Sequence, residues 1–196
     1  MLVFIMMAAS LLFAGEVYAA ERAMWVWGMS EEIVLDDPAG SRAEFFSFCE
    51  APHGDASKAV TIIYFSSSAG GIDLISSFPE ELRGFLAAAH SRGLRVDCLT
   101  GDKSWATPTR FIDETWIGRI KGEEKCDAIL AFNTGASFGA ERFDGIHYDV
   151  EPHGLSYSRG DDYDWDNNNA LIWTEYLALL DSCQAKVDTY NASPLA

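Results

Sequence analysis

Apolar and polar residues follow one another along this chain in blocks that predict strands separated by helices. Short runs rich in β-branched and aromatic residues, bounded by glycine and polar turns, are typical of buried strands. Longer stretches in which apolar residues recur every three or four positions are typical of amphipathic helices. We expect strands over residues 23–27, 59–65, 94–99 and 143–150, and helices over residues 42–50, 79–93, 109–132 and 169–190.

The second of these helices carries the clearest signals. Pro79 stands at its start, where the fixed φ of proline suits the first turn and no needed backbone donor is lost. Gly93 provides a stop at the other end. Its apolar stripe at helical spacing consists of Leu82, Phe85, Leu86 and Ala89. The third helix, residues 109–132, contains Gly118 and Gly122, and we expect a break near one of these glycines.

The order strand then helix occurs four times, which predicts an α/β fold with right-handed crossovers and a parallel sheet. This order alone fits both a closed barrel and an open, doubly wound sheet. A nucleotide-binding open sheet would carry a glycine fingerprint at the start of the helix after the first strand. That fingerprint is missing from the sequence, so a nucleotide-binding open sheet loses its main support.

The amino-terminal segment has the pattern of a signal peptide. Residues 1–12 are almost wholly apolar, a run too short to span a membrane, and small residues follow it. We expect a signal peptide over residues 1–19, cleavage before Ala20, and one domain over residues 20–196. The chain would then be secreted or periplasmic, with no membrane attachment after cleavage. A buried amino-terminal strand or helix is the alternative.

Composition narrows the classes of function. Of the 196 residues, 48% are hydrophobic, which is enough for a packed core, and the formal net charge is −16. That charge argues against nucleic acid and anionic membranes as partners, because both are bound by clustered Lys and Arg. We expect no cofactor. No cysteine lies in a CxxC pair, and the sequence does not choose among the three possible pairings of Cys49, Cys98, Cys126 and Cys183.

The segment at residues 143–151 is the strongest candidate for chemistry. Alternate residues of a strand share a face, so His147, Asp149 and Glu151 would point one way and the apolar residues between them the other. These three groups would form a line that ends at the carboxyl end of the fourth strand. In a barrel, the active site lies at the carboxyl ends of the strands.

The run from Asp144 to Glu151, Asp-Gly-Ile-His-Tyr-Asp-Val-Glu, resembles the fourth-strand signature of the family 18 glycoside hydrolases, the chitinase-like barrels. That signature reads Asp-Gly-x-Asp-x-Asp-x-Glu, and His147 stands in place of its second Asp. The resemblance implies a (β/α)8 TIM barrel acting on a polysaccharide or oligosaccharide. Glu151 would be the general acid/base, and Asp149 would assist it by orienting the acetamido group of the substrate.

A complete barrel has eight strand–helix units and about 250 residues. The sequence supplies the first four βα units of such a barrel. We therefore expect residues 20–196 to be the amino-terminal half of a glycosidase-like domain, or a fragment. The carboxyl-terminal half would then be its missing partner.

Further residues are candidates for binding the carbohydrate. Tryptophans in or just after strands can stack on sugar rings, and an acid within an apolar strand needs a partner. The candidate substrate-binding residues are His147, Trp27, Asp97, Asp102, Trp105 and Trp165.

Three other interpretations remain open. The charged residues could simply be solvated at a strand end, or the protein could be a non-catalytic carbohydrate-binding barrel or an inactive truncated relative. A metal-dependent hydrolase is the third, with His147, Asp149, Glu151 and His153 as ligands. We rank it lower and expect no metal, because the strand rise spreads these four residues over about 13 Å.

Overall fold

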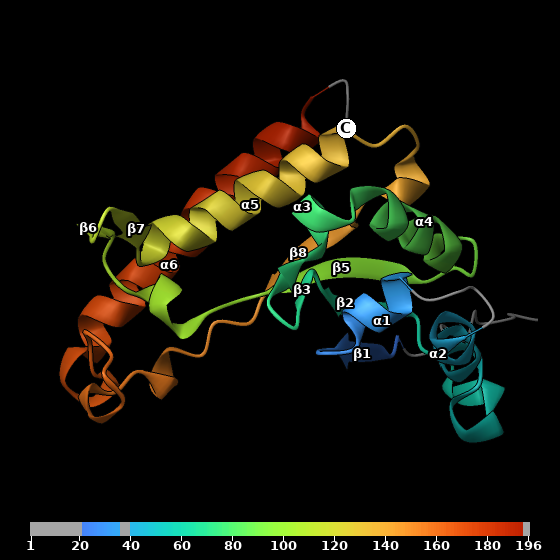
Figure 1. Cartoon of the computed structure of the whole chain (residues 1–196), viewed down its shortest axis with the longest axis horizontal. Coiled ribbons are helices and arrows are strands. Elements are labelled where there is room, and N and C mark those ends of the chain that lie inside the picture. The colour runs from blue at the N-terminus through green and yellow to red at the C-terminus, as the bar shows by residue number, and fades with distance from the viewer. Residues whose placement is uncertain (1–20, 36–39, 194–196) are drawn as a thin grey trace, which may run out of the picture.

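The structure is a computed structural model that describes residues 21–35 and 40–193. The predicted signal peptide, residues 1–19, lies outside the described residues. Four parallel strands form the central sheet in the order β1-β2-β5-β8 (Figure 1). Their bounds are Ala23–Val26 for β1, Ile62–Ser66 for β2, Arg95–Thr100 for β5 and Gly145–Tyr148 for β8. The predicted α/β class with a parallel sheet is confirmed.

The sheet is covered by helices on one of its faces. Strand residues that point to this face, including Ile63, Phe65, Val96 and Cys98, pack in one buried cluster with residues of several helices. The helices are α1 (Ser30–Leu35), α2 (Ser41–Glu50), α3 (Leu74–Ser77), α4 (Pro79–His90) and α5 (Arg119–Thr134). The order of the strands never reverses along the sheet. Since right-handed crossovers that all advance in one direction leave their helices on the same side, the topology accounts for this one-sided covering.

Helix α4 confirms the most detailed helix prediction. Pro79 is its first residue, and all four predicted stripe residues are buried: Leu82, Phe85, Leu86 and Ala89. Phe85 stacks on Phe46 of α2 and on Phe65 of β2, with ring centroids 5.8 and 4.4 Å apart. The helical spacing of these residues therefore turns one face of α4 toward both the sheet and α2.

The predicted helix over residues 109–132 is wrong in its first third. Residues Arg110–Ile112 and Thr115–Ile117 form the antiparallel hairpin of β6 and β7, and α5 begins at Arg119. Asp113 and Glu114 at the hairpin turn adopt positive φ. Gly118 also has φ of 81°, and a Cβ there would lie 2.2 Å from the carbonyl oxygen of Pro108. The glycine is therefore a strict boundary, and the aromatic and β-branched residues before it pair as strands.

Other elements differ from the sequence-based expectation in extent. Neither α1 nor α3 (Leu74–Ser77) was expected, nor the short hairpin of β3 (Ser68–Ala69) with β4 (Ile72–Asp73). The last helix, α6, spans Trp165–Asn191 and starts earlier than predicted, because the Asp164 side chain accepts a hydrogen bond from the backbone of Asp166. It lies along α5 (Figure 1). No helix among the described residues is both long and apolar enough to cross a membrane.

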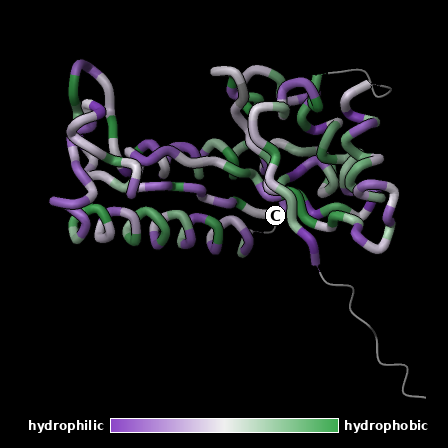
Figure 2. Tube along the Cα trace, turned by 90° about the horizontal axis from the view of Figure 1, so that it is seen from below, coloured by the Kyte–Doolittle hydropathy of each residue, from purple (hydrophilic) through white to green (hydrophobic). Residues whose placement is uncertain are grey.

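Hydropathy differs between the part of the chain that contains the sheet and the long helix α6. In the view of Figure 2, apolar segments gather in the compact part that contains the sheet, while α6 shows polar and apolar residues in alternation along its length. Its buried residues, Ile172, Leu179 and Cys183, recur at helical spacing. A single stripe of α6 therefore packs against the rest of the molecule.

Asp144, which precedes β8, ties that strand to its neighbour. The Val96 backbone N–H donates to Oδ2 of Asp144 at 2.7 Å, and the Asp144 N–H donates to the Val96 carbonyl at 2.9 Å. His90 Nε2 lies 2.9 Å from the same Oδ2, and its Nδ1 lies 2.6 Å from the carbonyl oxygen of Ala140. The hydrogen bond to Asp144 raises the pKa of His90. Burial alone would raise the pKa of Asp144, but hydrogen bonds from His90 and Val96 outweigh it and lower that pKa.

We expect His90→Gln to destabilise the fold by about 1 kcal/mol in a pH-dependent way. Because the pKa of His90 is raised on folding, its contribution is complete below the ordinary value of 6.5 and is lost as pH rises through the raised pKa. Because the pKa of Asp144 is lowered, its contribution is complete above 3.8 and is lost as pH falls through the lowered pKa. The destabilisation by His90→Gln should therefore be largest between pH 3.8 and pH 6.5.

Urea unfolding of wild type and variant across this pH range measures the effect. The exposed His153 offers a matched control as His153→Gln, whose difference from wild type should not vary in this way. A His90→Gln difference that stays flat from pH 4 to pH 9 would contradict the assignment.

Candidate functional site

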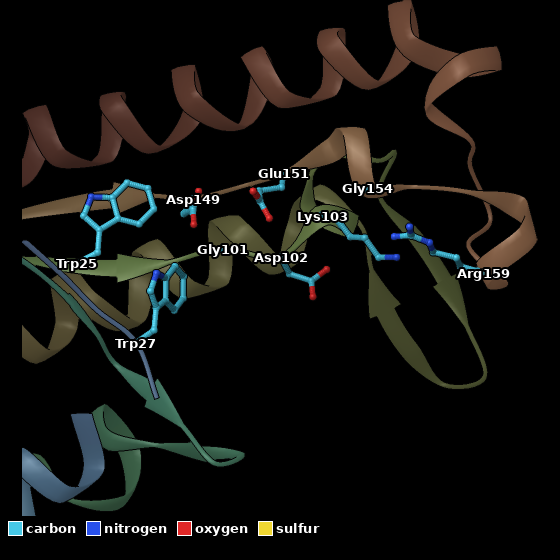
Figure 3. Close-up of a pocket in the computed structure, with 9 residues that line it drawn as sticks. All are labelled: Trp25, Trp27, Gly101, Asp102, Lys103, Asp149, Glu151, Gly154 and Arg159. Carbon is cyan, nitrogen blue, oxygen red and sulfur yellow. The ribbon is translucent and has the colours of Figure 1, made fainter. Parts of the chain in front are cut away.

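An open cleft of about 750 Å³ lies at the carboxyl ends of β1, β5 and β8 (Figure 3). Its walls come from loops far apart in the sequence that the parallel sheet brings to one edge. Two tryptophans stand at one end, carboxylates in the middle and two cations at the other end. The lining residues are Trp25, Trp27, Gly101, Asp102, Lys103, Asp149, Glu151, Gly154 and Arg159.

The alternation of faces along and after β8 places the two carboxylates in the cleft. Ile146, Tyr148 and Val150 pack into buried clusters, while Asp149 and Glu151 line the cleft. The predicted two-face pattern is therefore confirmed. The strand itself is shorter than the predicted residues 143–150, but the Asp149 N–H still donates to the carbonyl of Thr100 at 2.9 Å. This bond extends the pairing with β5 as far as the first carboxylate.

Gly101 permits this close approach. It follows β5 directly, and a Cβ at this position would lie 2.0 Å from the carbonyl oxygen of Asp149 and 2.4 Å from the carbonyl carbon. Any side chain here would push the backbone of Asp149 away from β5, because both obstructing atoms belong to the main chain. Gly101 therefore fixes the depth at which the Asp149 carboxylate enters the cleft.

His147 lies behind the aromatic end of the cleft and is not among its lining residues. Its ring centroid is 4.2 Å from that of Tyr64 and 5.4 Å from that of Trp25. Trp25 in turn lies 6.4 Å from Trp27. The imidazole thus belongs to an aromatic group that supports Trp25 from the open face of the sheet.

Trp25 and Trp27 provide a broad apolar surface at the cleft. They are 48% and 46% exposed, far more than is usual for a residue as large and apolar as tryptophan. The sequence pattern identifies Trp27 as a candidate and places both on one strand face, but favours a core position for at least one of them. Neither is buried, because helices cover the opposite face of β1.

The polar end of the cleft is organised around Asp161. Lys103 Nζ lies 2.7 Å from Oδ2 of Asp161, which also accepts a hydrogen bond from the Ser156 backbone at 2.8 Å. These two hydrogen bonds lower the pKa of Asp161, and the one from Lys103 has the larger effect. Asp102 accepts hydrogen bonds from the Ser104 N–H and hydroxyl at 2.8 and 2.6 Å, so it also shapes the loop. In Figure 3, Lys103 and Arg159 extend toward one another beyond Asp102.

Besides His147, three more of the predicted substrate-binding residues do not line this cleft. Asp97 is 6% exposed and forms a two-point ion pair with Arg95, at 2.9 and 3.0 Å. Trp105 packs edge-on against Tyr148 at 6.0 Å, between β8 and the two long helices. Trp165 starts α6 and joins the cluster of Val150 and its neighbours. Each of the three has a structural partner instead.

Five cleft residues are absent from the set predicted from the sequence: Trp25, Gly101, Lys103, Gly154 and Arg159. Lys103 directly follows the candidate Asp102, so the position of Asp102 after a strand could have indicated Lys103 as well. Arg159 comes from a loop eight positions beyond Glu151, as counted along the sequence, and no periodic pattern marks it. Such loop residues reach a site through the path of the chain, which local patterns do not encode.

Comparisons with family models, curated proteins and solved structures give no match. Within the described ranges, no group of three or more His, Cys, Asp and Glu side chains is arranged to hold a metal ion.

We expect Gly101→Ala to destabilise the fold by about 1–3 kcal/mol, because the added methyl group has no space beside the Asp149 backbone. Chemical unfolding measures this loss. The control is Gly139→Ala, at an exposed glycine whose Cβ would meet nothing within 4 Å. Equal stability of the two variants would show that β5 and Asp149 do not approach as closely as described.

Proposed function

We propose that this chain is part of a glycoside hydrolase-like protein that acts on an oligosaccharide or polysaccharide. The observation that carries the proposal is one cleft in which Asp149 and Glu151 stand beside Trp25 and Trp27. Glycosidic bonds are cleaved by carboxyl groups, and tryptophan rings stack on the apolar faces of sugars. In this proposal Glu151 is the general acid/base, and Asp149 assists it.

The architecture supports this proposal through the position of the cleft. Sequential strands without reversal, helices on one face and a cleft at the carboxyl ends are features of a (β/α)8 barrel. We propose that the described sheet is the first half of such a barrel, with the open face as its interior. We also propose that residues 1–19 direct the chain to export, as their sequence suggests.

The first two residues of the motif have structural roles that require no catalysis. Asp144 joins β8 to β5 and α4, as described above. A Cβ on Gly145 would lie 2.8 Å from Oδ1 of Asp97, so the glycine leaves room for the Asp97–Arg95 ion pair. The chemical argument therefore depends on Asp149 and Glu151. With His147 among aromatic rings, the proposed mechanism includes no carboxylate behind Asp149.

The position of His147 among aromatic rings favours one alternative, a non-catalytic carbohydrate-binding protein. Without a further acidic group in line behind Asp149, the cleft could retain its sugar-binding surface and lack turnover. The two proposals share the tryptophans and differ in the role of Glu151. Turnover and its dependence on Glu151 therefore separate the two proposals, whereas a tryptophan variant tests both.

We expect Glu151→Gln to lower kcat on a susceptible glycan by about 10²–10⁴-fold, because an amide cannot donate the proton that the leaving oxygen needs. Binding should persist, since the amide has nearly the same shape. Hydrolysis assays and calorimetry on the protein with its full domain measure the two effects. Glu80→Gln, an exposed change on α4, is the control. Undiminished turnover in Glu151→Gln would exclude Glu151 as the acid.

We expect Trp27→Ala to weaken oligosaccharide binding about tenfold while stability changes little, because the indole is half exposed. Trp116→Ala is a matched control, since Trp116 is 48% exposed but lies on β7 and does not line the cleft. Isothermal titration with soluble glycans gives both affinities. Equal affinities for the two variants would remove Trp27 from the binding surface and contradict both proposals.

A further inference from the structure

Two cysteines face each other between the two longest helices. Cys126 of α5 is fully buried and Cys183 of α6 is 4% exposed, and with Leu179 they form one buried cluster. Cys126 Sγ lies 4.0 Å from the carbonyl oxygen of Cys183, and the two thiols are within hydrogen-bonding reach of each other. Both are free thiols in the structure. The sequence alone leaves three pairings open, whereas this contact singles out one.

The surroundings of the pair differ from those of an ordinary buried thiol. The Tyr148 hydroxyl donates to the carbonyl oxygen of Gly122 at 2.9 Å and lies 3.1 Å from Cys183 Sγ. The hydrogen bond from the Cys126 thiol outweighs burial and lowers the pKa of Cys183. A lowered pKa favours the thiolate, which is the form that attacks a disulfide.

The other two cysteines provide the contrast. Cys49 and Cys98 are buried in the cluster between the sheet and its helices. Burial raises the pKa of each of them to about 12. Both therefore stay protonated at neutral pH and behave as small apolar residues.

We propose that Cys126 and Cys183 form a disulfide that joins α5 to α6 when the chain meets a disulfide oxidant. Each of the two helices contributes one sulfur to the pair. The closed loop contains β8 and both carboxylates of the cleft. The proposal does not rest on the proposed function, because it concerns the pairing of the helices and not the cleft.

The oxidation balances with a disulfide donor such as oxidised glutathione. The Cys183 thiolate attacks one sulfur of the donor and releases one glutathione thiolate, which gives a mixed disulfide. Cys126 then loses its proton and attacks Cys183 Sγ, which releases the second glutathione. One S–S bond forms in the protein as one S–S bond of the donor breaks. Two electrons pass to the donor, which leaves as two thiols after protonation.

The test begins with the unaltered chain. The protein is equilibrated with oxidised glutathione, free thiols are blocked with iodoacetamide in denaturant, and peptides are mapped by mass spectrometry. We expect a linked pair of peptides containing Cys126 and Cys183, lighter than the two reduced peptides by two hydrogen atoms. Cys49 and Cys98 should be alkylated. Alkylation of all four thiols, or linkage of any other pair, would overturn the proposal.

Stability gives a second, independent readout. A disulfide that closes a long loop restricts the unfolded chain, so the oxidised protein should unfold several degrees above the reduced protein. Cys126→Ala/Cys183→Ala should lose this shift between oxidised and reduced samples. Cys49→Ala/Cys98→Ala should keep it, even where the lost side chains lower both midpoints. An oxidant-induced shift that persists in the first double variant would contradict the pairing.

Discussion

The pairing of β8 with β5 is held at both ends, and the arrangement of the cleft depends on it. At one end the Asp144 carboxylate accepts the Val96 N–H, and at the other the Asp149 N–H reaches Thr100 beside Gly101. A slip by one residue would exchange the two faces of the strand. Tyr148 and Val150 would then face the cleft, and the carboxylates would be buried among apolar side chains. These two hydrogen bonds therefore decide where the acidic groups lie.

The elements predicted well were those whose structure is determined by the spacing of residues close together in the sequence. The stripe of α4 follows from the spacing of Leu82, Phe85, Leu86 and Ala89, and the two faces of β8 follow from simple alternation. The β6–β7 hairpin was missed because its short strands look like part of a longer helix until the close approach of Gly118 to Pro108 is known. That approach joins residues by tertiary structure, which periodicity does not contain.

The candidate site could be predicted in part, for a related reason. Asp149, Glu151, Asp102 and Trp27 lie where the ends of parallel strands meet, and that rule could be applied to the sequence. Trp105 fits the same rule but packs against Tyr148, and Asp97, predicted as an acid within an apolar strand, pairs with Arg95. A buried acid signals that a partner exists without saying whether the partner is a ligand or a neighbouring side chain. Arg159 could not be placed because its loop has no repeating pattern.

The one-sided covering of the sheet has a consequence for solubility. In the described part of the chain, β1 and β8 are the outer strands, and each offers backbone donors and acceptors along its free edge. Trp25 and Trp27 on β1 and just after it add apolar area beside one of these edges. Such an edge attracts other strands in parallel or antiparallel register. In concentrated solution these edges should favour self-association, which the formal net charge of −16 opposes.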